Sequence, residues 1–500
     1  MPEPAEQAAD MIAGPDAGPA PAVRSALVLA VCLLLAALSL LLPAAPGADP
    51  WAWIIWGREV GELSLDTTAG PSWKPLPVIF TAPFSIFGDA APELWLVVAR
   101  AGGLAALVFA FMLARRLAGT TRPGLGVLAG SVAVGGIVLL PEWVTFMAQG
   151  TSEPLAVGLI LLAVLRHLDG RPGHALVLGF VVALARPEAW PFLAVYGAFV
   201  FHRHPGLRPL AGGLALAVPL LWFVPDWIGA GDPLYGARRA RAHSEGVQLG
   251  GETTSRALRQ ALETFLVPVL AAAVAGVVFA WRRRERATLV LAAVSFPWVL
   301  LVVGMAVAGY RGNSRYMVPA AAVICVLAGV GAARLLDGVQ VPRLRYALAA
   351  ALVAVSVPFG VPRASEMGDQ ADRVRLEDRL VDDLPEAVRE AGGRAAILRC
   401  GRPAANGFPR RPGMDRAVAW QLHVPLHRVP LLRGTGRRSL RGASGSIVLF
   451  APPNGSPSAS AGGRAVRRLA RTVHWDVAAV NPPESCASRA GQAALARSRR

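Results

Sequence analysis

Long apolar runs separated by short polar loops repeat along most of the chain. A helix that crosses a bilayer needs roughly 17 to 25 mainly apolar residues, and eleven segments approach or reach this length. The pattern therefore predicts a polytopic α-helical membrane protein with about 11 spans. The segments are 25–43, 92–113, 124–140, 154–166, 174–186, 189–202, 207–224, 262–281, 287–308, 316–336 and 345–361.

The pattern changes after residue 362. A polar helix is predicted near 369–391, and short apolar runs at Ala395–Leu398 and Ser446–Phe450 indicate strands between loops rich in proline and glycine. We therefore expect a transmembrane domain over 25–362 and a small α/β domain over 363–500. Residues 1–24 are acidic and lack an apolar pattern, which predicts a disordered tail.

Composition agrees with a membrane chain, because hydrophobic residues make up 54% of it, charged residues 17%, and the mean hydropathy is +0.45. Such values exclude an ordinary soluble enzyme. The net charge of +17 comes almost entirely from arginine, and Lys74 is the only lysine. Basicity that reflects a general replacement of lysine by arginine is weak evidence for nucleic-acid binding, so no nucleic acid is expected as a partner.

Arginine placement predicts the orientation. If the N-terminal tail is cytoplasmic, the inner loops hold more arginine than the outer loops hold arginine and lysine together, as the positive-inside rule requires. An odd number of spans then places residues 363–500 outside the cytoplasm. The predicted location is the cell membrane, with the N-terminus cytoplasmic and the C-terminus extracytoplasmic.

The first external loop, 44–91, is too polar to span a membrane and too apolar for an ordinary loop. Its tryptophan-rich part, with Trp51, Trp53, Ile54, Ile55, Trp56 and Val60, suits an amphipathic helix lying in the membrane interface. Residues 75–87 suggest a second such helix. The loop is therefore predicted to carry two juxtamembrane helices with a polar segment between them.

Three ionisable residues of this loop are candidate site residues. Asp49 directly follows the first helix, where a carboxylate can act as a general base towards a hydroxyl; the alternative is helix capping or a solvated charge. Lys74 offers a compact ammonium for phosphate contact, although it can equally be a lysine retained by chance. Asp66, between the two helices, is a candidate for substrate binding.

Further ionisable residues stand near the outer ends of predicted spans, where charge is costly unless it is paired or functional. Arg100, Arg186 and Arg315 are candidates for binding a phosphate, and Glu153 and Glu188 for orienting hydroxyl groups. The alternative is structural ion pairing, such as Arg186 with Glu188 or Arg100 with Glu153. All five residues are predicted to gather at one membrane face.

Four cysteines are present. Cys32 and Cys325 lie inside predicted helices and are interpreted as small apolar residues. Cys400 and Cys486 lie in the predicted outer domain, where the compartment permits a disulfide between them. No Cys/His spacing resembles a metal site, so no metal ligand is predicted.

Short motifs around the first external loop resemble the first third of the GT-C glycosyltransferases. They are Asp49 after the first helix, then Gly57-Arg58-Glu59, Lys74-Pro75-Leu76-Pro77, Phe87-Gly88, Ala99-Arg100 and the helix exit Ala114-Arg115-Arg116-Leu117-Ala118-Gly119. The pattern is most similar to protein O-mannosyltransferases and lipid A aminoarabinose transferases. The resemblance is clear over 45–120, looser over 150–335, and does not reach the C-terminal domain. Pro50 and Trp73 stand where many members have a further acid.

The resemblance implies a GT-C-like fold and transfer of a hexosyl or pentosyl group from a polyprenyl-phosphate-linked donor. The acceptor would be a lipid, glycan or protein on the outer face of the membrane. It also implies that Asp49 is the catalytic carboxylate and that Lys74 lies near the lipid phosphate. No cofactor is assigned with certainty, and a divalent metal ion is left open. Direct attack by the acceptor would invert the anomeric carbon, whereas retention needs a second positioned carboxylate.

Two other classes of function remain open on the sequence. A lipid-linked sugar flippase or transporter would bind a similar ligand without chemistry, but transporters place their binding groups near the bilayer midplane within inverted repeats. No repeat is visible here, and the polar residues gather at the outer ends. A structural anchor for the C-terminal domain would need neither Lys74 nor the predicted arginine group.

Overall fold

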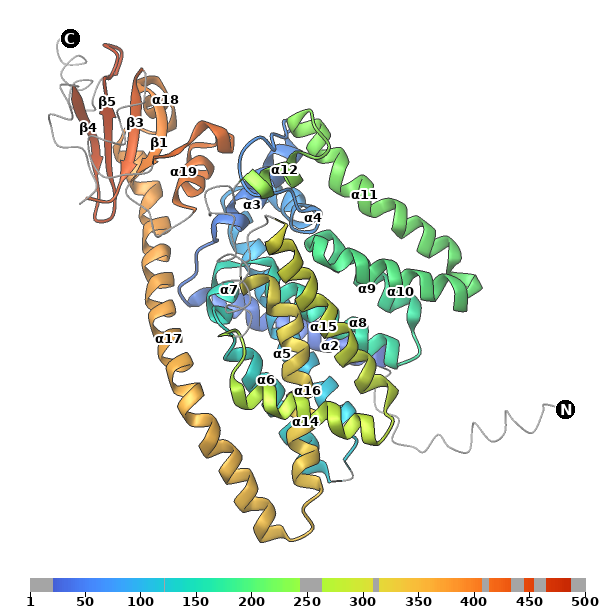
Figure 1. Cartoon of the computed structure of the whole chain (residues 1–500). Helices are drawn as coiled ribbons and strands as arrows, with labels where there is room; N and C mark the ends of the chain where they lie inside the picture. The colour runs from blue at the N-terminus through green and yellow to red at the C-terminus, as the bar shows by residue number, and fades with distance from the viewer. Residues whose placement is uncertain are drawn as a thin grey trace.

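The computed structural model describes residues 21–120, 122–242, 263–308, 314–406, 413–432, 445–453 and 465–486. Each of the eleven predicted apolar segments contains a helix within the described residues, and the three short ones correspond to α8, α9 and α10 (Figure 1). The helical body contains α2 (Pro21–Leu38), α5 (Ala91–Ala118), α6 (Pro123–Val138), α7 (Trp143–Gln149), α8 (Ser152–Leu168), α9 (Pro172–Ala185), α10 (Trp190–Arg203), α11 (Arg208–Ala230), α12 (Tyr235–Ala242), α14 (Val267–Arg282), α15 (Arg286–Val307), α16 (Val318–Asp337) and α17 (Pro342–Glu390).

Among the described residues, five helical segments are long and apolar enough to cross a membrane, or six if the bent pair α6 and α7 forms one span. The helices α9 and α14 and the segment Ala26–Leu41 are apolar but shorter. The exact number of spans therefore stays a prediction. The predicted tail lies mostly within residues 1–20, which are outside the described residues.

The helix α16 lies at the centre of the body and packs against α5, α6 and α14. Small residues allow this close packing. A Cβ on Gly331 would collide with the carbonyl of Ala272 in α14, and one on Gly329 would collide with the carbonyl of Ala129 in α6. Helices inside a bilayer gain little from burying apolar surface against one another, so close van der Waals contact through small residues is their main source of packing energy.

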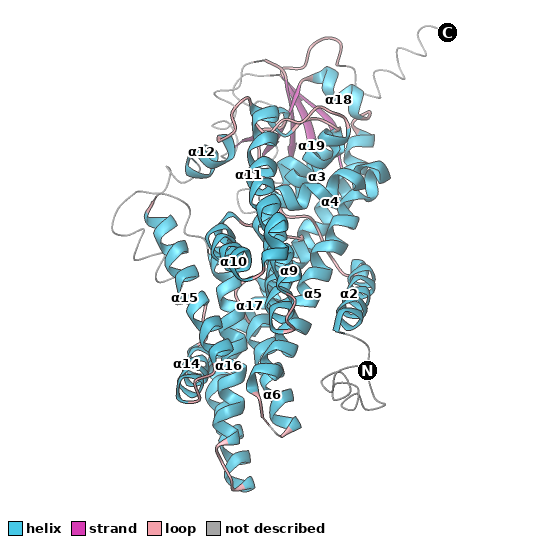
Figure 2. Ribbon diagram, turned by 90° about the vertical axis from the view of Figure 1, so that its right-hand side faces the viewer, coloured by secondary structure: helices cyan, strands magenta, loops and turns pink. Residues whose placement is uncertain are grey.

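Two helices of the loop 44–91, α3 (Ala48–Gly61) and α4 (Pro75–Phe84), lie between the helical body and the C-terminal domain (Figure 2). Both are helical, as the sequence predicts. The prediction that α3 is amphipathic is wrong, because every residue from Pro50 to Glu59 is buried. The placement of α3 at the level of the membrane interface stays a prediction. Its tryptophans pack instead against α4, α5 and the C-terminal domain.

The last helix of the body, α17, continues for 49 residues, so the predicted span 345–361 and the predicted polar helix 369–391 are one helix. Its second half leads into a five-stranded sheet of order β2-β1-β3-β5-β4 (Figure 1). Only the β3–β5 and β5–β4 pairs are antiparallel. The elements are α18 (Arg394–Cys400), β1 (Arg402–Asn406), α19 (Met414–Leu422), β2 (Leu431–Leu432), β3 (Ile447–Ala451), β4 (Val466–Arg471) and β5 (Asp476–Val480).

One predicted strand is confirmed and one is wrong. The run Ser446–Phe450 corresponds to β3, whose residues are all buried. The run Ala395–Leu398 belongs to α18, because alanine, leucine and arginine favour a helix and only one face of this short element is buried. The sheet is tied to α17 by the Trp475 indole, whose N–H donates to the Leu380 carbonyl at 2.7 Å.

A disulfide joins Cys400 at the end of α18 to Cys486 after β5, and Cys32 and Cys325 are buried and free. Thiol labelling of the denatured, unreduced protein should therefore modify only Cys32 and Cys325. Because the bridge joins residues 86 positions apart, Cys400→Ser should destabilise the C-terminal domain by about 2–4 kcal/mol. Labelling of four cysteines in the unmodified protein would contradict the bridge.

Candidate active site

Asp49 stands in the first turn of α3, where the exposed N–H groups of the helix favour an acid. The Gly47 N–H before it donates to the Gln149 carbonyl at 2.9 Å and ties this turn to the end of α7. Arg315 Nη1 donates to Asp49 Oδ2 at 2.9 Å, and Arg416 Nη1 lies 3.8 Å from Oδ1. Each carboxylate oxygen therefore faces a guanidinium group.

Burial raises the pKa of Asp49, but the charges of Arg315, Lys74 and Arg416 outweigh burial and hold the pKa well below its usual range. Asp49 is consequently ionised at neutral pH, the form that a base requires. A strongly lowered pKa also makes a weak base. An anion that drew Arg315 and Lys74 away would therefore strengthen Asp49 as a proton acceptor.

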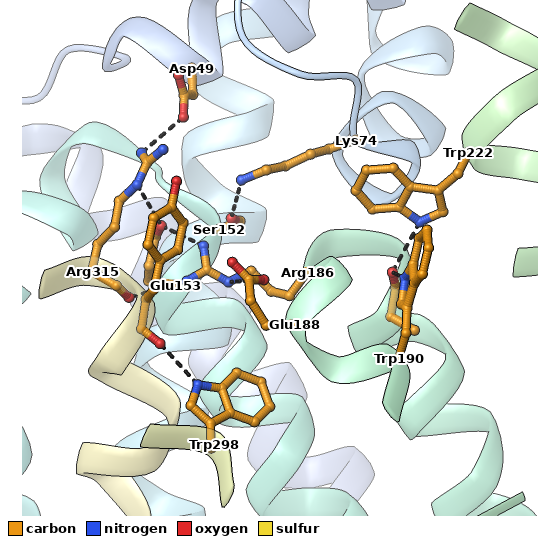
Figure 3. Close-up of polar contacts among 12 residues, drawn as sticks. Asp49, Lys74, Ser152, Glu153, Arg186, Glu188, Trp190, Trp222, Trp298 and Arg315 are labelled. Atoms are coloured by element: carbon orange, nitrogen blue, oxygen red, sulfur yellow. Dashed lines mark hydrogen bonds and ion pairs between the residues drawn. The ribbon is translucent and has the colours of Figure 1, made fainter. Parts of the chain in front are cut away.

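A buried ion-pair chain continues from this point (Figure 3). Glu153 lies in the first turn of α8, and Arg186 follows α9, where Pro187 keeps the preceding residue extended. Arg186 Nη1 donates to Glu153 Oε1 at 2.8 Å, and its Nε lies 3.7 Å from Glu188 Oε2. Arg315 Nε lies 3.8 Å from the same Glu153 oxygen. The side chains of Glu153, Arg186 and Glu188 are all buried.

Lys74 stands directly before α4, where the prolines at the start of that helix fix the entry of the chain. Its side chain is buried, its Nζ donates to Ser152 Oγ at 3.4 Å, and Nζ lies 5.2 Å from the centre of the Trp53 ring. An ammonium carries three donors, so one long hydrogen bond satisfies it poorly. Burial, followed by the positive charges of Arg186 and Arg315, lowers the pKa of Lys74 to about 8.

The guanidinium carbons of Arg186 and Arg315 each lie 5.3 Å from the centre of the Tyr316 ring. The Trp298 indole N–H donates to the Tyr316 carbonyl at 2.9 Å, and Arg186 Nη2 donates to the Arg315 carbonyl at 3.1 Å. These contacts hold η5 (Ser314–Met317), which carries Arg315, against α15 and the turn after α9.

The structure brings six of the predicted site residues together. We call this set the charge cluster: Asp49, Lys74, Glu153, Arg186, Glu188 and Arg315. The pairing of Arg186 with Glu188, which the sequence left as an alternative, does form, and Glu153 is a second partner. Ion pairs of this kind serve both structure and ligand binding in proteins.

Two predicted site residues lie apart from the charge cluster. Arg100 does not pair with Glu153; its guanidinium donates to Ser39 Oγ at 2.9 Å and to the carbonyls of Ser39 and Met147 at 2.7 and 3.3 Å. It therefore joins the end of α2 to α7. Asp66 pairs with the His427 ring of the C-terminal domain at 2.7 Å. Phosphate binding by Arg100 and substrate binding by Asp66 gain no support from these contacts.

Sequence reasoning missed Arg416, Ser152 and Tyr316. Ser152 and Tyr316 are direct neighbours of residues that were singled out, so their place in the sequence could have suggested them. No sequence signal marks Arg416, because α19 approaches α3 only through the tertiary fold. Trp53 was noted only as an interfacial tryptophan, whereas its ring supports the Lys74 ammonium.

The site carries an excess of positive charge. The basic residues are Lys74, Arg186, Arg315 and Arg416, and the acidic residues are Asp49, Glu153 and Glu188. This balance, with a poorly satisfied buried ammonium, favours an anionic ligand. The part of the chain that the structure describes contains no group of three His, Cys, Asp or Glu side chains that could hold a metal ion. Each acid of the site faces a guanidinium instead, so these residues do not suit a divalent metal.

Protein-family models show no match to this chain, and no curated protein matches it. Among solved structures, ArnT from Cupriavidus metallidurans bound to undecaprenyl phosphate is similar, with TM-score 0.53 and 15% identity over 94% of this chain and 100% of that one. The apo state of that ArnT gives TM-score 0.52 and 16% identity over 91% and 97%. An oligosaccharyltransferase from Archaeoglobus fulgidus gives TM-score 0.45 and 14% identity over 81% and 64%.

The likeness to ArnT extends over nearly the whole of both chains and shows the fold. This likeness confirms the GT-C-like fold that the motifs around Asp49 and Lys74 predicted. The predicted small C-terminal domain contains a sheet. With the apolar helices of the body, the likeness places this chain among membrane proteins.

Proposed function

We propose that this protein is a glycosyltransferase that moves a sugar from a polyprenyl-phosphate-linked donor to an acceptor hydroxyl. The observation that carries the proposal is the buried Lys74 ammonium, which makes a single long hydrogen bond within the described part of the chain, beside Arg315 and Arg186 and close to an ionised Asp49. These residues combine a binding site for an anion with a proton acceptor. The GT-C fold and the undecaprenyl phosphate bound to the similar ArnT support this choice of ligand.

Lys74 and Arg315 are the groups proposed to receive the donor phosphate. Lysine binds phosphate as a point charge and arginine as a planar fork, so the two can hold different oxygens of one phosphate group. Arg186 has Glu153 at 2.8 Å and Glu188 at 3.7 Å, both buried. Its role is therefore proposed to be support of Arg315, through the hydrogen bond to the Arg315 carbonyl.

Asp49 is proposed as the general base. The acceptor oxygen attacks the anomeric carbon, the bond between that carbon and the phosphate oxygen breaks, and polyprenyl phosphate leaves with the electron pair. The acceptor proton passes to Asp49. Arg315 cannot hold both Asp49 and the phosphate with full strength, so donor binding weakens the Asp49–Arg315 pair and raises the basicity of the carboxylate when it is needed.

The helices α3 and α4, at whose starts Asp49 and Lys74 stand, lie at the end of the helical body that carries the C-terminal domain (Figure 1). Asp49 also lies 3.8 Å from Arg416 of that domain. We propose that this end of the body is the extracytoplasmic side, with a cytoplasmic N-terminus, so that donor and acceptor meet outside the cytoplasm. The Cys400–Cys486 bridge supports this placement, since structural disulfides persist in oxidising compartments. The chain is then a multi-pass protein of the cell membrane whose acceptor is a membrane lipid, glycan or protein.

Binding of undecaprenyl phosphate to the purified protein tests the anion site. Lys74→Ala should weaken binding by about tenfold to a hundredfold, because it removes a charge-assisted contact worth about 1.5–3 kcal/mol. Lys74→Arg should recover only part of the affinity at pH 7, since a guanidinium does not fit a site built for an ammonium. Full affinity in both variants would make Lys74 an ordinary buried residue.

The same binding measurement has an expected pH dependence. The pKa of Lys74 in the free protein is about 8, so the ammonium is present below that pH and is lost above it. Affinity for undecaprenyl phosphate should therefore fall as the pH rises from 7 to 9. The Lys74→Arg variant should show a flatter profile over this range, because arginine stays protonated. Parallel profiles for both proteins would contradict the assignment.

A further inference from the structure

The C-terminal domain approaches Asp49 through the start of α19. Gly413 precedes this helix with φ +113°, and a Cβ on it would lie 3.0 Å from Ala48 Cα and 3.1 Å from Ala48 N. Only glycine permits both this backbone conformation and this distance. The backbone of the C-terminal domain therefore contacts the first residue of α3, immediately before Asp49.

Because α19 lies close to α3, Arg416 contacts two residues in the first turn of α3. Its Nη1 donates to the Ala48 carbonyl and lies 3.8 Å from Asp49 Oδ1. Arg315 binds the other carboxylate oxygen, Oδ2, from the helical body. Asp49 is thus held from two sides, by one arginine of each domain. The two partly buried side chains, 19% exposed for Arg416 and 15% for Asp49, are sheltered from full solvent screening.

Further contacts fix α19 on α3, so the position of Arg416 does not depend on its own ion pair. The Trp420 and Trp51 rings lie 6.4 Å apart, and the Arg58 guanidinium lies 5.1 Å from the centre of the Trp420 ring. Arg58 Nη2 also donates to the Val424 carbonyl at 3.1 Å. These residues form a contact between the two domains beside the charge cluster.

We propose that Arg416 is a positioning residue for Asp49, and that the C-terminal domain thereby forms an essential part of the active site. The catalytic part of this inference rests on the proposed function. The reason is that Arg315 and Arg416 contact different oxygens of the Asp49 carboxylate. When the donor phosphate takes Arg315, Arg416 keeps Asp49 oriented towards the acceptor through Oδ1 and through the Ala48 carbonyl. Without Arg416, the carboxylate loses its second anchor at the moment that it must accept a proton.

A carbodiimide that modifies protonated carboxyl groups, followed by mass spectrometry, tests the contact in the full-length protein without any substrate. Far above its pKa, the protonated fraction of Asp49 rises tenfold for each unit by which the pKa rises. Loss of one opposite charge at this distance raises a carboxyl pKa by about one unit. Arg416→Gln should therefore raise the rate of Asp49 modification at pH 5 about tenfold, and Arg416→Lys should return it close to the original rate.

The variant Arg416→Gln keeps an N–H donor for the Ala48 carbonyl. It therefore removes the charge beside Asp49 while a hydrogen bond to the first turn of α3 can still form. Arg399→Ala, which removes an exposed arginine of α18 in the same domain, is the matched control and should leave the rate unchanged. An unchanged rate in Arg416→Gln, or an equal rise in Arg399→Ala, would overturn the inference. This readout stands even if no sugar transfer is found, so it is independent of the proposed function.

Transfer kinetics test the catalytic part. Arg416→Gln should lower kcat by about tenfold or more, since small displacements of a catalytic group cost up to about a hundredfold. The KM for the polyprenyl-phosphate donor should stay near its original value, because Arg416 is not among the groups proposed to bind phosphate. Arg416→Lys should recover part of kcat. A raised KM with an unchanged kcat would overturn the positioning role and move Arg416 to the donor site.

Discussion

Asp49→Asn should slow sugar transfer by at least about a hundredfold, while the protein folds, inserts and binds undecaprenyl phosphate. Asparagine preserves the size of the side chain and can still accept a hydrogen bond from Arg315, but its amide does not accept a proton. The variant also loses the charge that holds Arg315 at 2.9 Å. Arg315 becomes more available to phosphate, so we expect affinity for undecaprenyl phosphate to stay equal or to increase.

This opposite movement of affinity and rate is specific to a base that shares an arginine with the donor. If the Asp49 carboxylate only stabilised the fold, its replacement would lower both the affinity for undecaprenyl phosphate and the rate of transfer. Glu62→Gln and Asp66→Asn are suitable controls, because both acids belong to the same loop and pair with histidines of the C-terminal domain, His423 and His427. Each should change the rate far less. A normal rate in Asp49→Asn together with an inactive Glu153→Gln would move the base to Glu153.

Arg186→Met should give the largest loss of stability among the charge-cluster variants. Arg186 is fully buried, and its removal leaves Glu153 and Glu188 buried without the guanidinium between them. Removing one partner of a buried ion pair typically costs about 3–5 kcal/mol. We expect a lower free energy of unfolding in detergent and a markedly lower unfolding temperature. Arg116→Met, which removes an exposed arginine paired with Asp169, is the control and should cost far less.

A double variant separates folding from function. Arg186→Met combined with Glu153→Gln removes a charge of each sign, so much of the lost stability should return. Transfer should remain low, because Arg315 loses the group that supports η5 and an ionic neighbour at 3.8 Å. If the double variant recovered both stability and full activity, the Arg186–Glu153 pair would be purely structural.

The helices of the body were predictable because an apolar run long enough to enter a bilayer has few alternatives to helix formation. The continuity of α17 was not predictable. Pro358 and Pro362 lie inside this helix, where proline normally ends or kinks a helix, so the sequence favoured a boundary there. The burial of α3 was missed for a different reason. A helix rich in tryptophan suits a membrane interface and a protein core equally well, and only the fold shows α19 covering it.

The charge cluster was largely predictable because each of its residues stands at the end of an apolar run, and such ends meet at a membrane surface. Lys74 and Asp49 also belonged to motifs with a known resemblance. The pairing within the cluster was less accessible, as the failed pairing of Arg100 with Glu153 shows. Arg100 lies on the same predicted face, but its side chain turns to the backbone carbonyls at the ends of α2 and α7. The position of a residue in the sequence predicts its depth along a membrane-spanning helix, but it does not predict which way the side chain points.

Sugar transfer by the purified full-length protein tests the central claim most directly. Radiolabelled polyprenyl-phosphate-linked hexoses and pentoses would be incubated with the protein and membrane acceptors, beside the Asp49→Asn variant. The account predicts that label moves from one of these donors to an acceptor with the unmodified protein, and at least about a hundredfold more slowly with the variant. If no donor supported transfer while the protein moved intact lipid-linked sugar across vesicle membranes, the protein would be a flippase and the proposed chemistry would be wrong.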